Sequence, residues 1–275
     1  IPLCSYMAFY FPLSIPVNMK TLLITGGAGF LGRELAIQLK NVYRVILGGR
    51  NTQQNIYASA LTGCDSTPLD VTNIESIRDA MNLYRPEIII HAAATKYVNL
   101  SEQFSHECID INIKGSQNIA RVASERGVRA VVGVSTDKAT PPGRTIYGLS
   151  KSVMEKLFSL ENERRDTLFT SVRLGNIAWS TGSVFPIWKT MLEKDDGVIK
   201  TTGAHMRRFI FSVSDAAEMV ADVLENITDV KGGVVAKEMK AVQMEDALKQ
   251  FIALYGGKYE KVGERLGESV DEVMI

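Results

Sequence analysis

The chain has 275 residues, and its 31 lysines and arginines balance its 31 aspartates and glutamates, so the formal net charge is zero. This balance gives no sequence-wide electrostatic reason to expect nucleic acid or an anionic membrane surface as a partner. The length suffices for one α/β domain with a smaller lobe. Cys4, Cys64 and Cys108 are widely spaced and form no metal-ligand pattern, so we expect reduced thiols, a cytoplasmic protein and no metal site.

Residues 1–18 are apolar but contain three prolines and no basic residue. A membrane-spanning helix needs about 20 mostly apolar residues, and a signal peptide begins with positive charge, so neither fits well. We therefore expect a leader outside the fold, which begins at Met19, and no membrane insertion. A truncated membrane anchor is the alternative.

A glycine-rich turn lies between a predicted strand, 20–25, and a predicted helix, 33–40. Its three glycines fit a tight turn, close approach of the backbone to a pyrophosphate, and packing of the helix on the sheet. A glycine turn without a ligand is the alternative, but the strand before it and the helix after it favour a dinucleotide site. The predicted cofactor-binding residues of this turn are Gly26, Gly29, Phe30, Leu31 and Gly32.

The residues after the second predicted strand, 43–47, bear on the choice of cofactor. NAD-binding proteins usually offer a carboxylate to the ribose hydroxyls at this point, but none occurs between Leu35 and Cys64. Arg50 instead stands where a guanidinium would meet a 2′-phosphate. We therefore predict that the cofactor is NADP. The alternative is NAD, and Arg50 would then be a solvated surface charge.

Two further strand ends carry polar residues. Asp70 and Val71 follow a short predicted third strand, where they either contact the adenine ring or, through Asp70, cap the helix that begins near Ile74. The strand at 87–91 ends in His91, which we expect to be packed rather than to act as a base.

Small side chains at Ala92, Ala93 and Ala94 leave room for a flat cofactor. The next predicted helix spans 105–127. Within it, Asn112 has two possible roles. It holds the backbone or a water close to the strand at 131–134, or it only satisfies a buried peptide group. The apolar positions expected on the buried side of this helix are Ile109, Ile113, Ile119 and Val122.

The most informative stretch begins with an apolar strand at 131–134 and continues directly into Thr136, Asp137 and Lys138. Carboxyl ends of strands in open α/β sheets are where ligands bind, so these side chains are candidates for chemistry. A surface ion pair between Asp137 and Lys138 is the alternative.

Tyr147 and Lys151 lie four residues apart on a predicted helix, which places them on one face. A neighbouring ammonium stabilises a phenolate, so Tyr147 is a candidate base near neutral pH.

A sixth strand at 168–174 completes a regular alternation of strands and helices, which indicates an α/β fold with a doubly wound parallel sheet. We assign residues 19–178, with 209–228 returning to the sheet, to an NADP-binding domain. Residues 179–208 and 229–275 form a small substrate lobe. Cations in the lobe would hold a phosphorylated substrate, although each alone is expected to be solvated.

These motifs together resemble the extended short-chain dehydrogenase/reductase superfamily, which implies a Rossmann fold. The finer resemblance, over Met19 to Ile275, is to the UDP-N-acetylglucosamine 4,6-dehydratases of polysaccharide and glycan biosynthesis. The segments that carry it are HAAATKYVNLSE (91–102), ECIDINIKGSQNI (107–119), STDKA (135–139), YGLSK (147–151), VRLGNIAWSTGSVFPIW (172–188), MRRFIFS (206–212) and ERLGESVDEVMI (264–275).

The resemblance implies a lyase in which Thr136 belongs to the catalytic set. Tyr147, assisted by Lys151, takes the proton of the sugar 4-hydroxyl while the C4 hydride passes to NADP⁺. Lys138 then removes the C5 proton, Asp137 protonates the departing 6-hydroxyl, and the hydride returns to C6. The presence of Tyr147 also makes the chain similar to family members that invert C5.

The same matching implies a UDP-sugar substrate and a homo-oligomer. Departures at Arg207, Leu266 and 269–271, and a longer loop at Arg144, border the sugar pocket and leave the identity of the sugar open. A UDP-sugar 4-epimerase or reductase on the same scaffold, and a non-catalytic NADP-binding sensor, are the alternatives. The residues matched to substrate binding are Lys96, Asn176, Ser183, Arg208, Arg265 and Glu268.

Overall fold

The seven strands of the central sheet all run parallel, and their order reverses once. The computed structural model describes residues 19–141, 143–164, 166–194, 197–202, 204–263 and 270–274. The order is β11-β6-β5-β4-β1-β2-β3, so the switch lies between β1 and β4, and the predicted doubly wound fold is confirmed. The strands are β1 (Thr21–Thr25), β2 (Arg44–Gly49), β3 (Asp65–Pro68), β4 (Ile88–His91), β5 (Ala130–Thr136), β6 (Leu168–Leu174) and β11 (Val234–Ala236).

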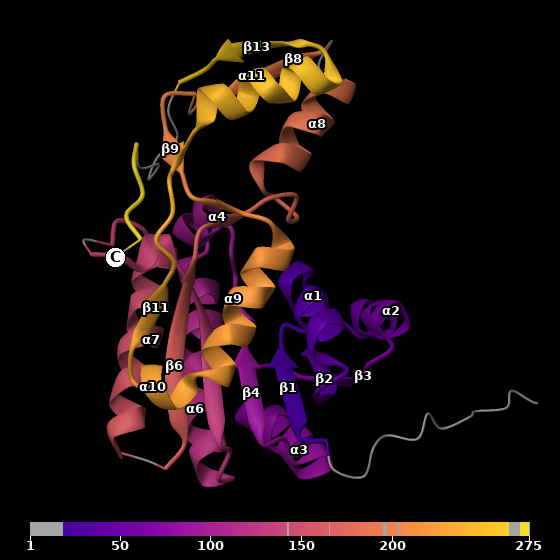
Figure 1. Ribbon diagram of the computed structural model, residues 1–275, viewed down its shortest axis with the longest axis vertical. Coiled ribbons are helices and arrows are strands. Elements are labelled where there is room, and N and C mark those ends of the chain that lie inside the picture. Colours follow the sequence, from indigo (N-terminus) through magenta and orange to yellow (C-terminus); the bar gives the residue numbers. More distant parts are fainter. Residues whose placement is uncertain are drawn as a thin grey trace, which may run out of the picture.

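Helices cover both faces of this sheet (Figure 1). Because successive side chains of a strand point to opposite faces, Leu22 and Ile24 of β1 enter one core while Leu23 enters the other. Burial on both faces explains the continuous apolar runs of the strands. The first core is closed by α1 (Phe30–Leu39), α2 (Thr52–Thr62), α9 (Val213–Glu225) and α10 (Ile227–Val230), and the second by α3 (Ile74–Tyr84), α6 (Gly115–Glu125) and α7 (Ile146–Arg164).

A smaller lobe lies beyond one end of the sheet, at the top of Figure 1. It has a core of its own, around Trp188, Ile199, Leu248 and Phe251. Its elements are α8 (Val184–Lys194), β8 (Val198–Thr201), α11 (Met244–Tyr255) and β13 (Lys258–Lys261). The strand pairs β7 (Asn176–Ile177) with β10 (Ile210–Phe211) and β9 (Arg207–Arg208) with β12 (Val242–Gln243) connect it to the sheet. The range 229–275, assigned to the lobe from the sequence, also contributes β11 to the central sheet.

The helix predicted over 105–127 is divided in three. A π-helical turn, η1 (Ile109–Lys114), separates α5 (Ser105–Cys108) from α6. Because the wider turn rotates the chain relative to a 3.6-residue period, Ile109 is exposed and Ile111 is buried, so the predicted buried stripe is wrong at Ile109. Two short helices, α4 (Val98–Gln103) and the 3₁₀ turn η2 (Asp137–Ala139), complete the described helices.

No helix within the described ranges is long and apolar enough to cross a membrane. The predicted leader, 1–18, lies outside the described residues.

Candidate active site

A cleft of about 1360 Å³ extends from the glycine-rich turn, past the end of β5, to the lobe. Nearly all predicted site residues line it. Of the exceptions, Asp70 and Asn112 do not reach the cleft, and Arg265 and Glu268 lie outside the described residues. The topology thus gathers predicted site residues that are up to 182 positions apart, from Gly26 to Arg208, around one space.

The glycine turn is packed so tightly that side chains would not fit. Gly26 has a positive φ of 69°, and a Cβ there would lie 2.8 Å from the backbone nitrogen of Ala93. A Cβ on Gly32 would lie 2.6 Å from the carbonyl oxygen of Gly26. Gly29, the N-cap of α1, provides no side chain to satisfy the first N–H groups of the helix. Those N–H groups are therefore suited to an anionic ligand in the cleft.

The ends of β2 and β3 border the same part of the cleft. Arg50 is exposed and lines the cleft, next to Asn51, whose side chain caps α2. The predicted capping role of Asp70 is wrong, because Asn73 caps α3. Asp70 instead accepts hydrogen bonds from the backbone nitrogen and the hydroxyl of Thr72, at 2.9 and 2.8 Å, and so closes the preceding turn.

His91 is fully buried, as expected for a packed residue at a strand end. Its Nδ1 lies 2.8 Å from Thr25 Oγ1 and its Nε2 lies 3.1 Å from Ser116 Oγ. Burial, together with the charge of Lys151, lowers the pKa of His91 to about 3, so the ring stays neutral at physiological pH.

Asn112 joins two elements behind the cleft. Its Oδ1 accepts from the backbone nitrogen of Thr95 at 2.9 Å, and its Nδ2 donates to Ser150 Oγ at 2.9 Å. Asn112 thus satisfies the peptide N–H of Thr95, in agreement with the interpretation that it pairs with a backbone group. At the same time it fixes the loop after β4 to α7, the helix that carries Tyr147 and Lys151.

Asp137 and Lys138 form an ion pair inside the cleft. Asp137 Oδ1 accepts from Lys138 Nζ at 3.0 Å and from Thr136 Oγ1 at 2.8 Å. The Asp137 side chain is fully buried and that of Lys138 is 20% exposed, so the alternative of a surface pair is wrong. Asp137 Oδ2 is buried without a hydrogen-bond partner among the described residues. Buried polar atoms in proteins are nearly always hydrogen-bonded, so this carboxylate oxygen is a candidate for contact with a ligand or for a catalytic role.

Tyr147 and Lys151 share a face of α7 and both line the cleft, but their electrostatics differ from the expectation. Burial, and then the charge of Asp137, raise the pKa of Tyr147 above its ordinary value, while a hydrogen bond with Thr136 opposes the shift. Lys151 Nζ donates to the carbonyl oxygen of Val134 at 2.8 Å, and burial lowers its pKa to about 8. The predicted lowering of the tyrosine pKa by Lys151 is therefore wrong, because desolvation of the phenol and the charge of Asp137 raise that pKa.

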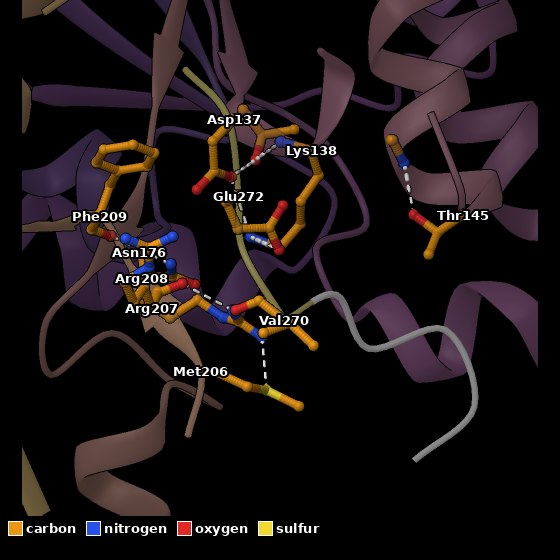
Figure 2. Close-up of polar contacts among 12 residues, drawn as sticks. Asp137, Lys138, Thr145, Asn176, Met206, Arg207, Arg208, Phe209, Val270 and Glu272 are labelled. Atoms are coloured by element: carbon orange, nitrogen blue, oxygen red, sulfur yellow. Dashed lines mark hydrogen bonds and ion pairs between the residues drawn. The ribbon is translucent and has the colours of Figure 1, made fainter. Parts of the chain in front are cut away.

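The lobe side of the cleft is built from β7, β9 and the start of α8. Asn176 Nδ2 donates to the carbonyl oxygen of Phe209 at 3.1 Å. Arg208 Nη1 donates to the carbonyl oxygen of Val270 at 3.1 Å, and Figure 2 shows this contact beside Asn176. Ser183 Oγ is buried without a hydrogen-bond partner among the described residues, and Lys96 lines the cleft opposite, with Nζ 5.6 Å from the centre of the Tyr97 ring.

Sequence reasoning missed a buried network behind the catalytic strand. Glu155 accepts two hydrogen bonds from Arg173, at 2.9 and 2.8 Å, and a third from Ser135 Oγ at 2.6 Å. Arg173 also donates to Thr140 Oγ1 at 3.1 Å. The available signal was the position of Glu155, one helical turn after Lys151 on the inward face of α7.

A family model described as "Polysaccharide biosynthesis protein" matches residues 22–275. The chain belongs to this family. Capsular polysaccharide biosynthesis protein CapD of Staphylococcus aureus is 34% identical over 91% of the chain, which covers 43% of CapD. The inverting UDP-N-acetylglucosamine 4,6-dehydratase of Campylobacter jejuni is 31% identical over 94% of the chain and 78% of its own length. UDP-glucose 4-epimerase of Rickettsia bellii is 30% identical over 93% of the chain and 77% of its own length.

Solved structures agree with the fold. Pen from Bacillus thuringiensis superposes with a TM-score of 0.83 at 25% identity, covering 91% of this chain and 79% of its own. The dTDP-glucose 4,6-dehydratase DesIV of Streptomyces venezuelae, solved with NAD, gives a TM-score of 0.80 at 21% identity, covering 93% and 88%. Within the polysaccharide biosynthesis family, the resemblance to UDP-N-acetylglucosamine 4,6-dehydratases stated from the motifs is confirmed.

Proposed function

We propose that the protein is a nucleotide-sugar 4,6-dehydratase that acts on UDP-N-acetylglucosamine or a close relative, with NADP as cofactor. The observation that carries this proposal is the buried pair Asp137–Lys138 in the same cleft as Tyr147 and the glycine turn. An acid and a base at neighbouring positions are what elimination of water requires. The name of the Campylobacter jejuni relative supports the same reaction.

The turn after β1 fits a dinucleotide. Its glycines leave no room for a Cβ, so the backbone itself forms the wall of the cleft, and the first N–H groups of α1 face a phosphate site. Arg50 would hold a 2′-phosphate. When bound, NADP⁺ would accept the hydride of C4 and later return it to C6, and the positive charge of its ring would favour ionisation of Tyr147.

Tyr147 takes the proton of the 4-hydroxyl in this proposal. Lys151, one helical turn further along α7, donates to the carbonyl oxygen of Val134 on β5 and so fixes this helix to the strand that carries Thr136. Thr136 contacts both Tyr147 and Asp137, so it keeps the phenol and the carboxyl oriented toward each other across the substrate.

Lys138 removes the C5 proton, and Asp137 protonates the departing 6-hydroxyl. In the ion pair, Lys138 carries the proton that Asp137 must hold before the reaction, since Lys138 must be neutral and Asp137 protonated before they act. One proton transfer across the 3.0 Å between Nζ and Oδ1 converts one arrangement into the other. Displacement of water by the sugar favours the neutral arrangement, because desolvation penalises charge.

A 4-epimerase is the second candidate, because relatives with that name match over almost the whole chain. An epimerase would use Thr136, Tyr147 and Lys151 and leave Asp137–Lys138 idle. The burial of Asp137 beside the cleft, with one unpaired carboxylate oxygen, favours the dehydratase. The reductase and sensor alternatives have no specific observation in their favour.

The decisive experiment is incubation with NADP and UDP-N-acetylglucosamine in deuterated water, followed by mass and proton spectra. A dehydratase gives a product that has lost water and carries deuterium at C5. The C5 configuration of that product tests the inversion that Tyr147 implies. An epimerised sugar with no loss of water would replace the first candidate by the second.

We also propose that the lobe, 179–208 and 229–275, binds the nucleotide sugar, since Ser183 and Arg208 line the cleft from that side. A cytoplasmic location agrees with the free thiols of Cys64 and Cys108, both buried. A homo-oligomer stays a prediction, to be measured by sedimentation.

A further inference from the structure

The chain segment 270–274 crosses the loop that carries Asp137 and Lys138. Arg207 fixes it from the lobe, through a two-point ion pair with Asp271, both distances being 2.7 Å. Met274 fixes it from the sheet, since its side chain is buried in the first core and its carbonyl oxygen accepts from Arg173 at 3.4 Å. Glu272 and Val273 lie between these anchors.

Glu272 faces Lys138 from this segment, as Figure 2 shows. Its Oε1 lies 3.7 Å from Lys138 Nζ, and its side chain is only 9% exposed. Asp137 Oδ1 lies 3.0 Å from the same nitrogen. The Lys138 ammonium is therefore enclosed by two carboxylates that come from distant parts of the chain.

We propose that Glu272 is a positioning residue of the acid–base pair, which holds Lys138 beside Asp137 and stabilises the ammonium that forms when Lys138 takes a proton. This inference rests on the proposed dehydration.

The charges around Lys138 agree with this role. The described charged groups that face Glu272 are Lys138 and Asp137 on η2 and Arg208 on β9, while Tyr147 on α7 faces Asp137. Burial raises the pKa of Glu272, and the two cations oppose that shift. Glu272 thus supplies the Lys138 ammonium with a second carboxylate, which favours the charged form.

The elimination step uses this second carboxylate. Before the step, Lys138 is neutral, Asp137 is protonated and Glu272 is ionised. Lys138 then takes the C5 proton as the C5–C6 double bond forms, and Asp137 gives its proton to the 6-oxygen as the C6–O bond breaks and water leaves. The net charge of the three side chains is the same before and after, and the new ammonium lies between two carboxylates.

The test measures Lys138 without any substrate. Trace acetylation of the protein at a series of pH values, read by peptide mass spectrometry, reports the neutral fraction of each lysine. In Glu272→Gln, the Lys138 ammonium loses one of its two carboxylate neighbours, so the uncharged amine becomes more populated and the labelling rate of Lys138 at neutral pH rises about tenfold. Glu272→Asp keeps the charge and gives a smaller rise. Glu225→Gln, which removes an exposed carboxylate at the end of α9, leaves the rate unchanged.

The second measurement is the pH profile of kcat with UDP-N-acetylglucosamine. The acidic limb moves to lower pH in Glu272→Gln, because the base loses its proton earlier, whereas a merely structural defect lowers kcat without moving the limb. Equal labelling of Lys138 in wild type and in folded Glu272→Gln overturns the inference. If Glu272→Gln does not fold, the same comparison is made between Glu272→Asp and Glu272→Ala, and equal labelling of Lys138 in those two variants overturns the inference. If wild type eliminates no water but the labelling still rises, the proposed function fails and the electrostatic role of Glu272 stands.

Discussion

The chemistry proposed for the cleft depends on a few side chains whose environments differ from what their types alone suggest. Tyr147 and Lys151 have the spacing expected of a catalytic pair, yet burial opposes ionisation of both. Asp137 and Lys138 are adjacent in sequence and were predictable as a pair. Glu272 was not, because a contact across 134 positions depends on the tertiary fold and not on local spacing.

Lys138→Ala should leave NADP binding intact and reduce formation of the dehydrated product by about 10²- to 10⁴-fold, the usual contribution of a general base. The reason is that no other described amine lies beside Asp137. Cofactor titration and product spectra provide the measurement. Lys156→Ala, an exposed residue of α7, is the control. Normal turnover of Lys138→Ala would remove the dehydration mechanism.

The stability of the protein should rise with pH because of Lys151. Its pKa is lowered from 10.5 to about 8 in the folded protein, so the unfolded chain binds more protons between these values. Across that window the free energy of unfolding of wild type should gain about 3 kcal/mol relative to Lys151→Met. Urea unfolding of both proteins at several pH values provides the measurement, and the comparison cancels the groups that do not interact with Lys151. Parallel curves would contradict the prediction.

Arg50→Ala should weaken NADP about tenfold to a hundredfold, the worth of a charge-assisted hydrogen bond, and leave NAD affinity unchanged. Titration with each cofactor decides this. An equal effect on both cofactors would mean that Arg50 contacts a group they share, and no effect would leave it as a surface charge.

At the scale of elements, the glycine turn and the alternation of strands and helices could be predicted because apolar runs and turn residues are local signals. The π-helical turn could not be predicted, since a one-residue widening leaves the composition of a helix unchanged. The same holds for β11, a strand of three residues whose assignment depends on finding β6 as a partner.

The buried pair Glu155–Arg173 joins α7 to β6, and through Ser135 it also reaches β5. Glu155→Gln should therefore destabilise the protein by about 3 to 5 kcal/mol, because Arg173 is left as an uncompensated charge. Asp65→Asn breaks the exposed pair with Arg44 and should cost less than about 1 kcal/mol. Chemical unfolding of both variants tests this, and similar losses would show that burial does not distinguish the two pairs.

At the scale of the whole molecule, the sheet and the lobe have separate hydrophobic cores, and the cleft lies where they meet. The two-part organisation was predictable from the change of pattern after Asn176. The seating of 270–274 over the catalytic loop was not, because it depends on anchors in both parts.

Trp188→Ala should disturb the lobe and leave the sheet intact, because Trp188 packs only in the lobe core. Removal of a buried tryptophan costs about 3 to 5 kcal/mol of packing. We expect weaker binding of UDP-N-acetylglucosamine with unchanged binding of NADP, measured by calorimetric titration. Equal loss of both ligands would show that the two parts do not respond separately.

The packing of α9 against α1 has a consequence for synthesis of the chain. The first strands and α1 leave the ribosome early, but α9, which covers part of their first apolar face, follows some 180 residues later. Until then that face is exposed to water and to other nascent chains, so a chaperone or rapid closure by α9 must protect it. A fragment that stops before Val213 should accordingly aggregate.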